Sequence, residues 1–120
     1  MQQTTKITDQ EPITSTLLNE EPYLADQIAK FVERLPKRIA DIGSTAGNQD
    51  WPTLKSQLHA LKGLCANYGY PSISQLAEHI EDTLSQQQHA RIAPLLEELA
   101  FLCRRVSVGV IDPQASQTAG

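Results

Sequence analysis

The chain has 120 residues, 40% of them hydrophobic and 20% charged, with a formal net charge of −4. This length suits one domain with a real core, and the acidic balance argues against general nucleic-acid binding, which usually needs a basic face. No apolar run reaches about 18 residues, so we expect no membrane-spanning segment. The first residues have no apolar stretch, so we expect no secretory signal and a cytoplasmic protein.

The two ends of the chain differ from its middle. Residues 1–13 are rich in Gln, Thr and acids and show no helical period, and residues 111–120 are similarly polar. We expect both to be flexible tails around a domain that spans residues 14–110. Residues 14–19 predict one short helical turn through Leu17 and Leu18.

The first long helix is predicted from Tyr23 to Ile42. Apolar residues recur there at spacings of three and four, after an acidic, proline-containing start signal. Pro36 interrupts the hydrogen-bond ladder, but the pattern stays in phase, so one helix is expected. Residues 43–48, GSTAGN, have the composition of a loop.

Three further helices follow. The second runs from Trp51 to Tyr68, with Asp50 or Trp51 as its cap, Pro52 in its first turn and Gly69 at its end. For the third, Pro71 predicts a turn, and residues 72–75, SISQ, match a capping box. The fourth has an apolar stripe over residues 92–106, with Pro94 tolerated in its first turn.

No segment alternates at period two. The sequence therefore predicts an all-α fold, an antiparallel four-helix bundle in up-down-up-down order with the short extra N-terminal helical turn. We expect a monomer. Cys65 and Cys103 lie on apolar stripes, so buried, reduced thiols are expected. A disulfide, or a zinc site with His59 or His79, is a weaker alternative because no pair has ligand spacing.

The second helix places His59 on its outer side. At 100° per residue, His59 points about 140° away from Leu54, which belongs to the apolar stripe. Lys55 lies one turn before it and Lys62 just under one turn after it, on the same side. Almost no bulky side chain covers this face, so the exposed imidazole and its two ammonium neighbours suit an approaching anionic group.

Residues 59–63, HALKG, with Gly69 ten residues after His59, resemble the core motif of histidine-containing phosphotransfer (HPt) domains. The likeness extends to residues 50–54, 68–71 and 76–81, and covers roughly residues 22–106. Small side chains are common in the family at three positions that here carry larger ones, a departure that bears on partner preference. These positions are Leu58, Leu64 and Cys65.

The resemblance implies a phosphocarrier of multistep His-Asp phosphorelays. His59 would be the phosphoacceptor, and Lys62, helped by Lys55, would offset the charge of the phosphoryl group, near −2. The implied partners are receiver domains of hybrid sensor kinases and response regulators, which carry the phosphorylated aspartate and supply Mg²⁺. The chain itself would hold no cofactor and no metal. Its docking surface would be bordered by residues near His59 on the helix: Lys55, Ala60, Gly63, Leu64, Ala66 and Asn67.

Other residues qualify this interpretation. Gly63 costs about 1 kcal/mol inside a helix, which indicates close approach of a partner or, alternatively, packing against another helix. His79 and His89 are expected to be surface residues. Three acids of the third helix are expected to form a solvated acidic face, not a carboxylate dyad: Glu78, Glu81 and Asp82.

The chain lacks a Gly-rich phosphate loop, so we expect it not to be an autonomous kinase. Two alternatives remain open. One is a helical adaptor that binds receiver domains without transferring phosphate. The other is an enzyme with His59 as general base, although no orienting carboxylate stands at helical spacing from His59. A test of phosphoryl transfer from a phosphorylated receiver would distinguish the phosphocarrier from the adaptor and the enzyme.

Overall fold

The structure, a computed structural model, describes residues 12–109. Four long helices make up most of this region: α2 (Ala25–Gly47), α3 (Trp51–Tyr68), α4 (Pro71–Ser85) and α5 (Ile92–Arg104). Short 3-10 turns, η1 (Pro22–Leu24) and η2 (His89–Arg91), lead into α2 and α5. No strand occurs in residues 12–109, where only an isolated bridge pairs Ile13 with Val106. No helix of this region is long and apolar enough to cross a membrane.

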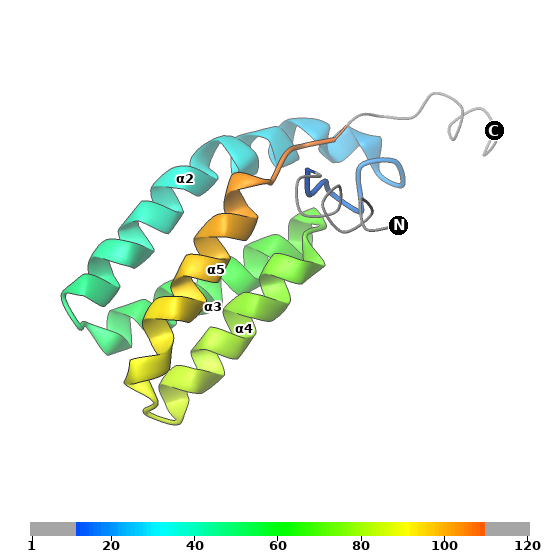
Figure 1. Ribbon diagram of the computed structural model, residues 1–120. Helices are drawn as coiled ribbons and strands as arrows, with labels where there is room; N and C mark the ends of the chain where they lie inside the picture. Colours follow the sequence, from blue (N-terminus) through cyan, green and yellow to red (C-terminus); the bar gives the residue numbers. More distant parts are fainter. Residues whose placement is uncertain (1–11, 110–120) are drawn as a thin grey trace, which may run out of the picture.

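The four helices form a ring around one core (Figure 1). Each helix packs against the two beside it, while the diagonal pairs α2–α4 and α3–α5 bring no Cα atoms within 8 Å of each other. The predicted four-helix bundle is confirmed. Its core is built from the apolar stripes that the sequence indicates, and in α3 these residues are fully buried: Leu54, Leu58, Leu61 and Cys65.

The end of α2 differs from the prediction. The helix continues through residues 43–47, which we assigned to a loop from their composition. One contact accounts for the extension, because Ala46 packs against the core. Tertiary packing therefore overrides the low helix propensity of two glycines. Pro36 lies inside α2, which stays one helix as expected.

Gly69 ends α3 as predicted. Its φ of +87° is left-handed, the conformation that glycine adopts most readily at a helix C-terminus. Space also demands glycine, because a Cβ there would lie 2.8 Å from the Thr16 backbone nitrogen. At the other end of α3, the Asp50 carboxylate accepts a hydrogen bond from the Thr53 N–H at 3.3 Å.

The start of α4 was predicted wrongly. The helix begins at Pro71, directly after Tyr70, and no side chain caps it. Tyr70 is buried and its hydroxyl donates to the Ser107 carbonyl at 2.7 Å, so the turn is held by tertiary contacts. Ser74 of the supposed capping box instead donates to the Lys62 carbonyl at 2.9 Å, which ties α4 to α3.

Residues 12–18 and 105–108 lie side by side at the end of the bundle where α5 stops, and we name them the terminal clasp (Figure 1). The Ile13 N–H donates to the Arg105 carbonyl at 2.7 Å, and the Ser107 N–H donates to the Ile13 carbonyl at 2.8 Å. Residues 16–20 turn, with the Glu21 N–H donating to the Leu17 carbonyl at 2.8 Å. The predicted tails lie outside the described residues, apart from Pro12 and Ile13.

Candidate functional site

His59 projects from the middle of α3 into solvent. Its side chain is 68% exposed, as its helical angle indicates. The ring is nevertheless held from one side, because its Nδ1 lies 3.2 Å from Oε2 of Glu81 on α4. The histidine is therefore accessible and oriented at once.

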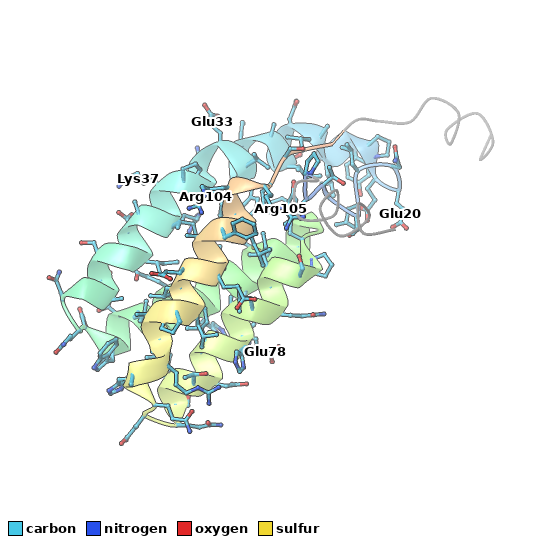
Figure 2. The ribbon with its side chains drawn as sticks, in the orientation of Figure 1. Glu20, Glu33, Lys37, Glu78, Arg104 and Arg105 are labelled. Atoms are coloured by element: carbon cyan, nitrogen blue, oxygen red, sulfur yellow. The ribbon has the colours of Figure 1, made fainter. Side chains whose placement is uncertain are left out.

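Glu81 corrects the sequence interpretation. We expected it in a solvated acidic face, but its side chain is only 15% exposed and it faces α3. One carboxylate oxygen contacts His59, and the other, Oε1, is buried without a hydrogen-bond partner, 3.6 Å from Nζ of Lys62. Glu81 thus bridges two residues that the sequence singled out. Glu78 lies on the same helix but is exposed, and Figure 2 labels it on α4.

The His59–Glu81 contact fixes the chemistry of the ring. An ionised carboxylate only accepts hydrogen bonds, so Nδ1 must be the nitrogen that carries the proton. In the neutral imidazole the lone pair then belongs to Nε2. The arrangement leaves a nucleophilic nitrogen on the side of the ring away from α4.

Lys62 lies one turn beyond His59 and is partly buried, with 30% of its side chain exposed. Its ammonium reaches Glu81, and its carbonyl is bound by Ser74, so α4 fixes both its backbone and its side chain. Lys55 is exposed and forms no salt bridge with any residue in 12–109.

Gly63 faces open space next to His59. A Cβ built on it would meet no atom within 4 Å, so no neighbouring helix packs against it. We offered two explanations for this glycine: packing against another helix and close approach of a partner. The open space excludes the first and is compatible with the second.

Residues 26–108, which include nearly all of the bundle, match the family model of the Hpt domain. The chain belongs to the Hpt domain family. Hpt domains are histidine phosphotransfer proteins of phosphorelays, where they interact with receiver domains, and they are carriers and not kinases. No curated protein and no solved structure matches the chain.

The residues expected around the docking surface of this Hpt domain fall into two groups. Lys55, Ala60, Ala66 and Asn67 are exposed on α3. Leu64, which we expected to border the docking surface, is partly buried, since it packs against the core and lines a groove between α2 and α3.

The other histidines of the Hpt domain are exposed, as predicted. The ring of His89 stacks on Trp51 with centroids 4.4 Å apart. No group of three His, Cys, Asp or Glu side chains suited to a metal ion occurs in residues 12–109.

Both cysteines are free thiols, and burial raises the pKa of each, Cys65 and Cys103, to about 12. They cannot form a disulfide without a rearrangement, because no Cα pair of α3 and α5 lies within 8 Å and a disulfide needs less than about 7 Å.

Glu81 and Ser74 are the site residues that sequence reasoning missed. Both belong to α4, and their contacts with α3 depend on how the two helices pack. A signal for Glu81 was present: it lies about 40° from Ala77 on a helical projection, and Ala77 is fully buried. A carboxylate at the edge of an apolar stripe faces the neighbouring helix.

Proposed function

We propose that His59 accepts a phosphoryl group from the phosphorylated aspartate of one receiver domain and passes it to the aspartate of another. The observation that carries this proposal is an exposed imidazole whose Nδ1 is occupied by Glu81 at 3.2 Å. This contact leaves Nε2 as the attacking atom and keeps the ring in one orientation.

In the accepting step, the Nε2 lone pair forms a bond to phosphorus. The bond between phosphorus and the aspartyl oxygen breaks, and that oxygen leaves with the electron pair as a carboxylate. The ring keeps its Nδ1 proton and gains positive charge, which the Glu81 carboxylate offsets. The donating step is the reverse, with a second receiver aspartate as the attacking group.

Lys62 has the complementary role toward the phosphoryl oxygens. Its ammonium lies 3.6 Å from Glu81, and part of its side chain remains exposed to solvent. When the phosphoryl group arrives, its charge of about −2 attracts this ammonium more strongly than a shared carboxylate does. The Mg²⁺ of the reaction belongs to the receiver in this scheme.

The two alternatives differ from carrier function in what surrounds His59. A general-base enzyme now gains the orienting carboxylate that the sequence did not reveal. However, a ring that is 68% exposed has no walls to exclude water or hold a small substrate. An adaptor would need neither Glu81 nor Lys62 at the histidine.

The test is transfer of radiolabelled phosphate from phosphorylated receiver domains of the source organism. We expect wild-type protein to take up label in an acid-labile, base-stable linkage, and His59→Gln to take up none while keeping its helical circular dichroism. His79→Gln and His89→Gln are the matched controls and should label normally. Binding of receivers without any label on the wild type would support the adaptor instead. Undiminished label on His59→Gln would refute the assignment.

A further inference from the structure

The two flanks of α3 differ in charge, because α2 has four cations and three acids, whereas α4 has three acids and no lysine or arginine. Four of the ten basic residues of the chain fall within residues 30–38 of α2. On the other side, α4 contributes Glu78, Glu81 and Asp82 and no lysine or arginine. A protein with a net charge of −4 therefore has its largest cluster of cations on the helix next to α3. The four cations are Lys30, Arg34, Lys37 and Arg38.

Three of these cations line the space between the two helices. Lys30, Arg34 and Arg38 border a groove whose α3 wall is formed by Leu64 and Tyr68. Arg38 also borders a second groove, which includes one acid, Asp41, and reaches Ala60. Since Arg38 is common to both, the two join into one surface, which we name the α2–α3 groove.

The α2–α3 groove reaches the vicinity of His59. Ala60, which lines the groove, directly follows His59 in the chain and has only a methyl side chain. Gly63 and Asn67, both exposed, lie on α3 between His59 and the groove, about 40° and 80° around the helix from His59. A protein seated over His59 therefore meets small side chains in the direction of α2.

The cations of the groove are available to a partner. Lys37 pairs with Asp41 at 3.3 Å on the outer surface of α2, where Figure 2 labels Lys37. Lys30, Arg34 and Arg38 form no salt bridge within residues 12–109.

We propose that the receiver domain docks with its footprint displaced toward α2, placing carboxylates opposite Arg34 and Arg38 and an apolar side chain against Leu64. This inference rests on the proposed function and specifies the surface that the partner uses. The acids of α4 repel the same carboxylates, so the charge of both flanks favours one orientation of the partner. Unpaired arginines are suited to this role because their guanidinium groups bind carboxylates in a bidentate manner.

The main experiment compares two charge reversals of equal size. Arg34→Glu/Arg38→Glu changes the groove, and Arg91→Glu/Arg104→Glu changes exposed arginines of η2 and α5, neither of which has a Cα within 8 Å of α3. For each, kcat/KM of transfer from a phosphorylated receiver is measured at low and at high salt. Labelling by phosphoramidate, which needs no docked protein, reports whether His59 is intact.

We expect the groove variant to lose about tenfold or more in kcat/KM at low salt, because steering by surface charge contributes factors of this size. The loss should shrink at high salt as the charges are screened, and phosphoramidate labelling should not change. An equal loss in both double variants, or none in the groove variant, would overturn the inference. Binding of duplex DNA in place of a receiver, lost in the groove variant, would overturn it as well.

A second measurement does not depend on substitutions. Titration of the labelled Hpt domain with an unphosphorylated receiver should shift the backbone NMR signals of residues 30–38 and 60–68. Shifts confined to residues 74–82 of α4 would place the receiver on the α4 side of α3 and contradict the inference.

The proposed function and the proposed docking surface can be distinguished by their failures. A wild type that accepts phosphate from no receiver contradicts the proposed function. Normal transfer with an unaffected groove variant contradicts only the docking surface.

Discussion

The two flanks of α3 are built differently. Toward α4 the surface is closed: Glu81 is 15% exposed and reaches both His59 and Lys62, and Ser74 binds the Lys62 carbonyl. Toward α2 the surface is open, with a groove lined by Leu64 and by arginines without salt bridges in the described region. α4 orients the imidazole ring, and in our proposal α2 offers the surface for the receiver. Chemistry and recognition can then be altered separately.

The largest effect is expected from Gly63→Leu, which tests the open flank. The side chain would stand between His59 and the groove, and transfer requires reacting atoms within about 3–3.5 Å. We expect transfer from a receiver to fall by about a hundredfold or more, with unchanged circular dichroism and no loss of thermal stability. Phosphoramidate labelling should suffer much less. Normal transfer would mean that the partner approaches from another side.

Glu81→Gln tests the closed flank. Gln keeps an acceptor oxygen for Nδ1–H but loses the negative charge that offsets the positively charged ring, and partners of this kind contribute about ten- to a hundredfold in comparable sites. Because Glu81 acts on the ring, the rates from phosphoramidate and from a receiver should fall together. Glu98→Gln, an exposed acid on α5, is the control. If the rate falls only with the receiver as donor, Glu81 contributes to docking and not to the orientation of the ring, and the proposed difference between the two flanks is wrong.

Lys62→Ala should have a smaller effect of the same type. It removes one charged contact with the phosphoryl oxygens. Such contacts are worth about 1–3 kcal/mol, and because the site is open to water we expect the lower end, roughly tenfold in rate. Both phosphate donors should again be affected, and the urea midpoint should stay near that of the wild type. Lys55→Ala, whose ammonium has no acidic partner among residues 12–109, should cost less. Equal rates for Lys62→Ala and wild type would reduce Lys62 to a surface residue.

The smallest effect concerns stability. Gly63→Ala should raise the free energy of unfolding by up to about 1 kcal/mol, since alanine is the better helix former and nothing lies within 4 Å of the new Cβ. Gly43→Ala in α2 is the matched control, because its Cβ also meets nothing. Urea unfolding followed by the single tryptophan, Trp51, measures both. If Gly63→Ala lowers the free energy of unfolding and Gly43→Ala does not, then another part of the molecule packs against Gly63.

The sequence predicted what depends on local periodicity. The four stripes, the left-handed Gly69 and the exposure of His59 all follow from residue spacing within one helix. The errors at the ends of α2 and α4 have one cause: Ala46 and Tyr70 are held by contacts with other elements, which override composition. Local signals such as a glycine-rich stretch or a capping box do not contain that information.

The same distinction separates the parts of the site. His59 and Lys62 stand three residues apart on one helix, so a motif reveals them. Glu81 is 22 residues from His59, and their contact depends on how α4 is rotated against α3. Leu64 shows the converse, since its helical angle placed it near the surface, whereas the proximity of α2 covers part of it.

The terminal clasp also determines how the molecule responds to mechanical force. Its bridge is parallel, and the chain leaves Ile13 toward the N-terminus and Val106 toward the C-terminus, in opposite directions. Tension between residues 12 and 109 therefore loads the two hydrogen bonds of Ile13 at 2.7 and 2.8 Å together, in shear. The clasp is also bonded to the C-terminal end of α3, because the Ser15 hydroxyl donates to the Tyr68 carbonyl at 2.6 Å. Once the two bonds of Ile13 break, the pull passes through Ser15 to α3, the helix that carries His59.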